Sequence, residues 1–171
     1  MKSPSLLHRL HGALTTAGRC FAPLLLLFIR LYWGWQYHVT GQGKLSDLSH
    51  PTQFFASLHI PAPHLNAIVV SVTECFGGLL LMVGLGTRFL VPIFIVEMLI
   101  AFITADRASF LAIFSDPDKF TGAAPFLFLA SFLVLFAFGP GVFSLDALIF
   151  KRERQSSPRA DREGSGGPGG I

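Results

Sequence analysis

The stretch Phe21–Val39, FAPLLLLFIRLYWGWQYHV, decides the fold of this chain. A helix needs roughly 17–25 mostly apolar residues to cross a hydrocarbon core of about 30 Å. This stretch meets that requirement, and only Arg30, Gln36 and His38 interrupt its apolar character. We therefore predict a membrane-spanning helix over residues 21–39.

Three further segments have the same character. They are Leu65–Leu85, Phe89 to about Ala105, and about Ala123 to Phe138, the last of which ends at Gly139-Pro140-Gly141. Only 13% of the 171 residues are charged and 51% are hydrophobic, whereas a soluble domain carries about 25% charged residues. The composition excludes a soluble nucleic-acid-binding module and a disulfide-stapled secreted scaffold. It predicts an all-α integral membrane protein, folded as an antiparallel four-helix bundle.

The distribution of lysine and arginine predicts the orientation of this bundle. Nine of them lie before the first helix, between the second and third, or after the fourth, against three in the other two connections, Lys44, Arg107 and Lys119. Because the cytoplasmic side carries the excess, we expect both termini in the cytoplasm of a multi-pass protein of a bacterial inner membrane. The expected organisation is a cytoplasmic segment (1–18), a membrane domain (19–150) and a disordered, basic, glycine-rich tail (151–171).

Three ionisable residues are predicted to lie at one depth. Counting about 1.5 Å per residue from Cys20, Leu85 and Arg88 places Arg30, Glu74 and Glu97 roughly 14–16 Å from the cytoplasmic boundary. A charge near the bilayer centre costs about 2.5–3.5 kcal/mol, so we expect all three side chains to face inward and pair. One arginine between two glutamates leaves a surplus negative charge, which predicts that one carboxyl group holds or exchanges a proton.

The remaining polar residues of the first helix support an inward-facing stripe. One helix face, with the spacing i, i+4, i+7, contains Arg30, Gly34, Tyr37, His38 and Gly41. The alternative interpretation of the charged layer is an ionic lock that holds three helices together without chemistry.

Histidines and cysteines give no further site. The histidines near the predicted outer side match no compact ligand spacing, so we predict no metal centre. Cys20 and Cys75 are expected at depths about 15 Å apart, too far for a disulfide.

Several motifs together resemble the DoxX family of small membrane proteins over about residues 20–150. These are Arg30-x3-Gly34, Gly41-x-Gly43-Lys44-Leu45, Phe54 through Ile60-Pro61-Ala62-Pro63, Glu74-x2-Gly77-Gly78, Gly84-x-Gly86-Thr87-Arg88, Gly139-Pro140-Gly141 and Ser144-Leu145-Asp146. The resemblance implies an antiparallel four-helix membrane protein. It also implies a link to thiosulfate:quinone oxidoreductase as a small membrane subunit, or to membrane complexes that handle thiol and oxidative stress.

The functional prediction joins this resemblance to the charged layer. We expect a membrane subunit of an oxidoreductase system, with sulfur- or thiol-linked electron transfer to or from quinone. Arg30, Glu74 and Glu97 are the candidate catalytic residues, and Tyr37, His38 and Lys44 are the candidate cofactor-binding residues. Lys44 also matches the outer-loop lysine of the family.

Two other functions are compatible with the sequence. One is a non-catalytic membrane scaffold for soluble redox enzymes, and the other is a small-solute or proton transporter that works as an oligomer. The expected partners are the lipid bilayer, a redox enzyme subunit and further copies of the chain, and nucleic acid is not among them.

Overall fold

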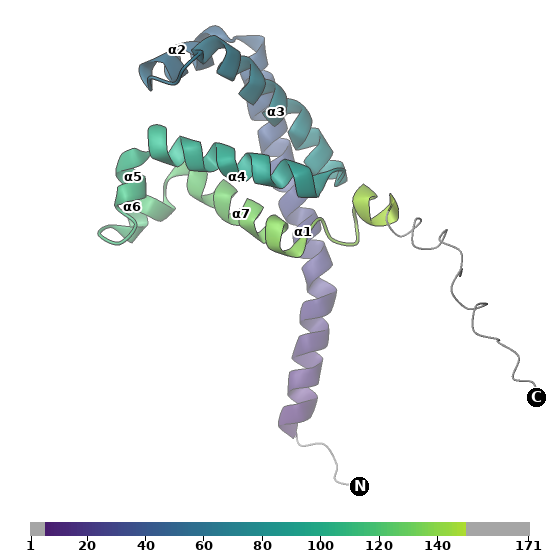
Figure 1. The fold of residues 1–171 in the computed structure, drawn as a ribbon. Helices are drawn as coiled ribbons and strands as arrows, with labels where there is room; N and C mark the ends of the chain where they lie inside the picture. The colour runs from purple at the N-terminus through teal and green to yellow at the C-terminus, as the bar shows by residue number, and fades with distance from the viewer. Residues whose placement is uncertain (1–5, 150–171) are drawn as a thin grey trace, which may run out of the picture.

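The computed structural model describes residues 6–149, which are helical and contain no strand. The predicted tail over residues 151–171 lies outside this part of the chain, as do the first five residues of the predicted N-terminal segment. Figure 1 shows the helices in chain order. They are α1 (Leu6–Ser46), α2 (Ser49–Ser57), α3 (Pro63–Val83), α4 (Thr87–Thr104), α5 (Arg107–Leu111), α6 (Pro117–Thr121) and α7 (Ala124–Phe138).

Helix α1 is much longer than the predicted span. It has 41 residues, which at 1.5 Å each give a length of about 61 Å, twice the hydrocarbon core. The flanks of the apolar stretch contain no strong helix breaker, and the hydroxyl groups of Thr15 and Thr16 donate to carbonyls four residues earlier within the helix. The N-terminal part of α1 therefore projects beyond the other helices (Figure 1).

Helix α3 runs antiparallel to α1 and packs tightly against it through small residues. A side-chain carbon added at Gly34 would lie 2.7 Å from the carbonyl oxygen of Gly78, and one added at Gly41 would lie 2.8 Å from that of Ser71. Both distances are too short for real atoms, so only glycine fits at these two positions. Small residues on facing helices allow such close approach in membranes.

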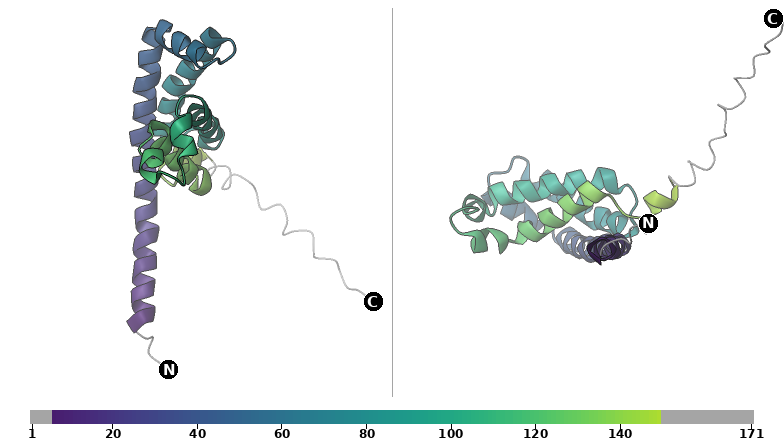
Figure 2. Two further views of the ribbon diagram at one scale, coloured as in Figure 1. Left: turned by 90° about the vertical axis from the view of Figure 1, so that its left-hand side faces the viewer. Right: turned by 90° about the horizontal axis from the view of Figure 1, so that it is seen from below.

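Helices α4 and α7 form a second pair that crosses the first (Figures 1 and 2). An aromatic core joins the two pairs, in which Tyr37 of α1 packs 4.6 Å from Phe94 and 5.2 Å from Phe132, measured between ring centroids. The prediction of an all-helical protein is thus confirmed for residues 6–149. An aligned four-helix bundle is not confirmed, because α4 and α7 lie across α1 and α3 rather than along them.

The turn between α3 and α4 sets this crossing. Gly84 and Gly86 both have positive φ, 71° and 64°, a conformation that glycine adopts without strain. The Asp146 carboxylate accepts hydrogen bonds from the backbone N–H groups of Gly86 (2.8 Å) and Thr87 (3.0 Å). The segment after α7 therefore caps the first turn of α4 and fixes the direction in which α4 leaves.

Three helices are long and apolar enough to cross a membrane. By length and composition these are Leu10–Ser46, Pro63–Val83 and Thr87–Thr104. The fourth predicted span corresponds to α7, which has 15 residues and a length of only about 22 Å. The described chain is accordingly that of a multi-pass membrane protein. Its fourth span and the cytoplasmic position of its termini remain predictions.

Candidate functional site

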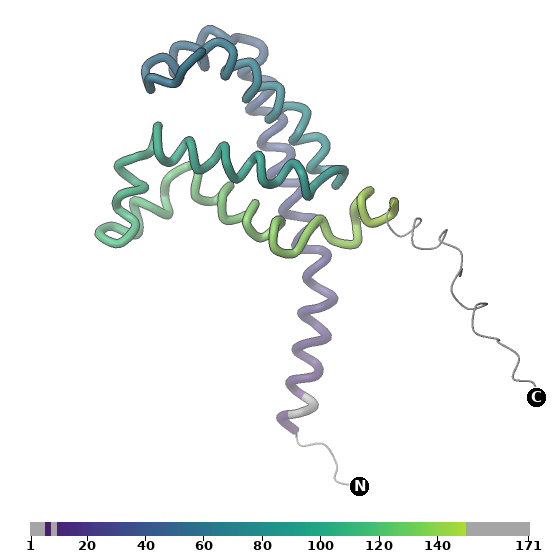
Figure 3. Tube along the Cα trace, in the orientation of Figure 1, coloured from purple at the N-terminus to yellow at the C-terminus, as the bar shows by residue number. Residues whose placement is uncertain are grey.

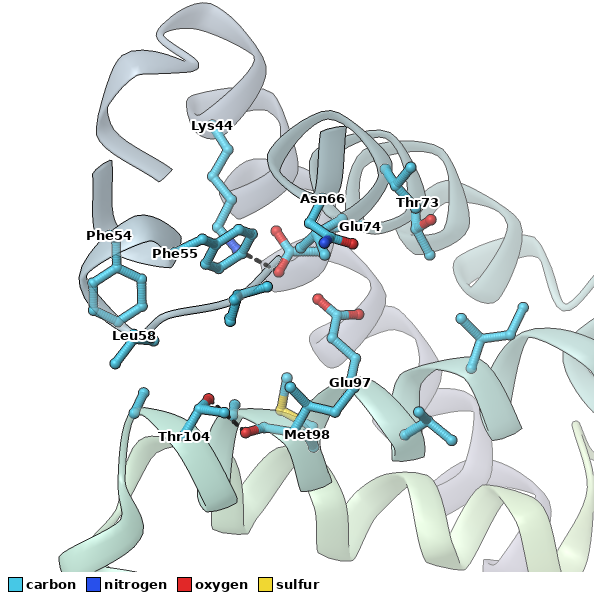
Figure 4. A pocket seen from close by; sticks show the side chains of 18 residues that line it. Lys44, Phe54, Phe55, Leu58, Asn66, Thr73, Glu74, Glu97, Met98 and Thr104 are labelled. Atoms are coloured by element: carbon cyan, nitrogen blue, oxygen red, sulfur yellow. Dashed lines mark hydrogen bonds and ion pairs between the residues drawn. The ribbon is translucent and has the colours of Figure 1, made fainter. Parts of the chain in front are cut away.

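A cavity of about 350 Å³ lies in the wedge that opens between α3 and α4. The two helices diverge from their shared turn, and α2 covers the wide end (Figures 1 and 4). Most of the lining is apolar. The polar residues in it are Lys44, Asn66, Thr73, Glu74, Glu97 and Thr104.

Lys44 and Glu74 form an ion pair on one wall of this cavity. The ammonium nitrogen of Lys44 lies 2.5 Å from Oε1 of Glu74, and the two side chains are 30% and 5% exposed. Lys44 is in the last turn of α1 and Glu74 is in the middle of α3. The antiparallel contact of these helices therefore brings together two charges that are 30 residues apart in the sequence.

Glu97 faces this pair from the opposite wall. Figure 4 shows its carboxyl group pointing from α4 toward Glu74. The second carboxyl oxygen of Glu74, Oε2, is buried and has no hydrogen-bond partner in the described part of the chain. The cavity thus holds one cation, two acids and an unsatisfied oxygen between them, in apolar surroundings.

The neutral polar side chains of the lining are partly occupied elsewhere. Asn66 donates from Nδ2 to the carbonyl oxygen of Pro61 at 2.7 Å, and Thr104 donates to that of Ile100 at 2.7 Å. The wall on the α2 side is aromatic and aliphatic, with Phe54 and Phe55 in it. The arrangement can accept hydrogen bonds from a flat, mostly apolar ligand that carries a donor group, and can hold a proton at a carboxyl group.

Arg30 is not part of this site, which corrects the predicted three-charge layer. Arg30 is 1% exposed. In the described part of the chain its guanidinium donates only to backbone carbonyls, to Leu81 (3.1 Å) and Met82 (2.8 Å) at the end of α3 and to Pro140 (2.6 Å) and Phe143 (2.8 Å) after α7. Arg30 therefore ties the end of α3 to the segment after α7. The cation beside Glu74 is Lys44.

The error in the predicted layer is one of register between helices. The depth estimate placed Cys20 level with Leu85. In the structure, Arg30, which is ten residues after Cys20 in the first helix, lies level with Leu81. Because Glu74 lies seven residues before Leu81, it is about 10 Å farther along α1 than Arg30, and the side chain of Lys44 reaches it there. Hydropathy gives the approximate extent of a span but not its register against a neighbour.

Tyr37 and His38 lie near the cavity but are not among its lining residues. Tyr37 is 3% exposed and packs in the aromatic core, where its hydroxyl group has no hydrogen-bond partner among the described residues. The ring of His38 lies 3.0 Å from the carbonyl oxygen of Cys75 through Nδ1. Of the six residues predicted for the site, the structure therefore brings Lys44, Glu74 and Glu97 together.

A signal for the role of Lys44 is present in the sequence. The series Arg30, Gly34, Tyr37 and Gly41 continues at the same alternating spacing of four and three to Lys44. Residues with this spacing share a helix face, so the inward stripe extends to the lysine. The contribution of α2 to the cavity has no comparable signal, because its position depends on how the connection folds back.

Comparisons with known proteins agree with the motifs. The DoxX family model matches residues 25–107, which include α3, α4 and all three charged residues of the cavity. The chain is 28% identical over 136 residues to "Putative oxidoreductase CatD" of Bacillus subtilis (strain 168), a match that covers 78% of this chain and 93% of that protein. No solved structure matches the chain. Residues 25–107 of this chain therefore match the model of the DoxX family.

Proposed function

We propose that this chain is a membrane subunit of an oxidoreductase system and that the cavity between α3 and α4 binds a quinone-type ring. The family and the name of the Bacillus subtilis relative support the oxidoreductase part of this proposal. The observation that carries the binding part is the buried, unpartnered Oε2 of Glu74 beside Lys44 and Glu97 in an otherwise apolar cavity.

The residues of the cavity fit such a ring. Small-molecule sites are concave, mostly apolar pockets of roughly 300–1,000 Å³ with a few polar groups that fix orientation. The cavity has a volume of about 350 Å³, and its α2 wall presents Phe54 and Phe55. Buried polar groups without a partner are rare in folded proteins, so the free oxygen of Glu74 favours a ligand that contacts it.

A bound quinone would supply a couple that takes up or releases two electrons and two protons. The residues of this chain would hold and orient the ring and manage protons at its edge. The ammonium group of Lys44 stabilises negative charge near Glu74, and the carboxyl group of Glu97 can hold a proton inside the cavity. We propose that a partner enzyme, with sulfur or thiol chemistry, exchanges the electrons.

In this proposal the charged cluster is Lys44, Glu74 and Glu97, in place of the Arg–Glu–Glu cluster predicted from the sequence. Arg30 instead positions the end of α3 from which α4 diverges. It is not among the residues that line the cavity.

Equilibrium binding to the purified full chain in lipid nanodiscs tests the proposal. The probe is duroquinone, a compact benzoquinone, together with its reduced form, and the bound fraction is measured by dialysis under nitrogen. We expect saturable binding of at least one form that weakens tenfold or more in Glu74→Gln. The matched control is Phe89→Leu, which changes an 81% exposed side chain outside the cavity and should bind as the wild type does.

Absence of binding to the wild-type chain, or equal binding to Glu74→Gln and wild type, would contradict the proposal. If partner enzymes still co-purify with a chain that binds no ring, the scaffold function predicted as an alternative accounts better for the protein.

A further inference from the structure

Among the buried polar atoms of the cavity lining, the one without a partner is an acceptor. Lys44 donates to Glu74, and the side chains of Asn66 and Thr104 donate to backbone carbonyls. The ammonium group of Lys44 and the amide group of Asn66 have further hydrogens, but Oε2 of Glu74 is the buried lining atom that has no partner in the described part of the chain. Thr73 adds one hydroxyl group, which can donate or accept.

The atom without a partner is a carboxyl oxygen. Oε2 of Glu74 is buried and accepts no hydrogen bond in the described part of the chain. The carboxyl group of Glu97 points toward Glu74 across the cavity (Figure 4). The Glu74 carboxylate that pairs with the ammonium group of Lys44 can only accept hydrogen bonds. A ligand that satisfies this oxygen must therefore bring a hydrogen atom of its own.

We propose that the cavity binds the reduced, hydroxyl-bearing form of the ring, a quinol, in preference to the oxidised quinone. This inference rests on the proposed function and specifies which redox form the site recognises. A quinol hydroxyl group donates to the free oxygen of Glu74, whereas a quinone carbonyl can only accept. A site whose buried polar groups must pair with a ligand hydroxyl group discriminates strongly against the analogue that lacks it.

A neutral donor fits the cavity better than a cationic one. Lys44 already places one positive charge beside Glu74, and a second cation at this distance would be repelled by the ammonium group. The apolar walls would also have to remove the hydration shell of a charged amine. An uncharged aromatic ring with hydroxyl groups avoids both the repulsion by Lys44 and the loss of a charged group's hydration shell.

The test measures dissociation constants for duroquinol and duroquinone separately, with the full chain in nanodiscs under nitrogen. We expect the wild type to bind the quinol at least tenfold more tightly than the quinone. In Glu74→Gln an amide that can donate replaces the acceptor carboxylate, so the ratio should fall to about one. Phe89→Leu, the control variant outside the cavity, should keep the wild-type ratio.

Each other outcome overturns the inference in a distinct way. Equal binding of the two forms, or tighter binding of the quinone, contradicts the preference and leaves the proposed function intact. Binding of neither form contradicts the proposed function itself. A full quinol preference in a folded Glu74→Gln chain shows that the carboxyl group does not select the ligand.

Infrared difference spectra of the wild-type chain give a second readout that does not depend on any variant. We expect a carboxylate band to shift when the quinol binds and to stay unchanged when the quinone is added. Identical carboxylate spectra for the two probes would overturn the inference.

Discussion

The ammonium nitrogen of Lys44 lies 2.5 Å from Oε1 of Glu74, and this contact joins the last turn of α1 to the middle of α3. The pair forms one wall of the cavity and determines which acid keeps a counter-charge. Glu97 faces the pair from the opposite wall, where it adds a second acid to the cavity (Figure 4).

Removal of the cation from this pair should destabilise the protein through the acid left behind. In Lys44→Met the nearly buried carboxylate of Glu74 loses its counter-charge. Breaking a fully buried pair costs about 3–5 kcal/mol. Because Lys44 is 30% exposed, we expect a smaller loss of unfolding free energy, of about 2 kcal/mol. Thermal unfolding in detergent, followed by circular dichroism, measures it. The double variant with Glu74→Gln should recover part of the loss, and strictly additive effects would contradict the pairing.

A methyl group at Gly41 should separate α1 from α3. In Gly41→Ala the added carbon would lie 2.7 Å from Cα of Cys75 and 2.8 Å from the carbonyl oxygen of Ser71. Overpacking of this kind costs about 1–3 kcal/mol. Gly43→Ala is a close control, because an added carbon there has nothing within 4 Å. We expect a lower melting temperature for the first variant only, and equal stability of the two would argue against the close helix contact.

Substitution of Arg30 separates a structural role from a catalytic one. Arg30→Lys keeps the charge but replaces a planar group with several fixed donors by a compact ammonium group. Buried carbonyls left without partners cost about 1–3 kcal/mol each, so we expect a loss of about 3 kcal/mol or more. The dissociation constant of the ring for the chain that remains folded should not change. Wild-type stability combined with lost ring binding would return Arg30 to the site.

The cap that Asp146 provides should affect α4 locally. Asp146→Ala removes both acceptors from the N–H groups of Gly86 and Thr87, and loss of a helix cap costs about 0.5–2 kcal/mol. Hydrogen exchange followed by mass spectrometry should show faster exchange in the first turn of α4. No such acceleration should occur in Asp118→Ala, since the Asp118 side chain makes no hydrogen bond in the described structure. Unchanged exchange in Asp146→Ala would contradict the capping role.

Hydropathy and the polar pattern were sufficient to predict three helices long and apolar enough to cross a membrane, and the inward face of α1. Burial of Arg30 and Glu74 follows from the high cost of a charge in hydrocarbon, and the structure confirms it for both. The partner of each charge could not be obtained in this way. Burial requires polar contacts but does not specify whether a carboxylate or a set of backbone carbonyls supplies them.

The crossing of the two helix pairs could not be predicted from the sequence either. Two positive-φ glycines and a cap from a segment 60 residues later fix the direction of α4. Apolar runs carry no information on that angle. Because the cavity exists only where α3 and α4 diverge, its aromatic wall from α2 could not be predicted either.

Photoaffinity labelling tests the central claim most directly, because it locates the ring on the chain. An azido-substituted quinone is irradiated with the full protein in nanodiscs, and labelled peptides are identified by mass spectrometry. We expect labels within residues 54–60 and 93–104, which line the cavity between α3 and α4, and loss of these labels when excess duroquinol competes. Labelling confined to residues 86–89 and 138–147, around the separate hollow at the other end of α4, would contradict the account.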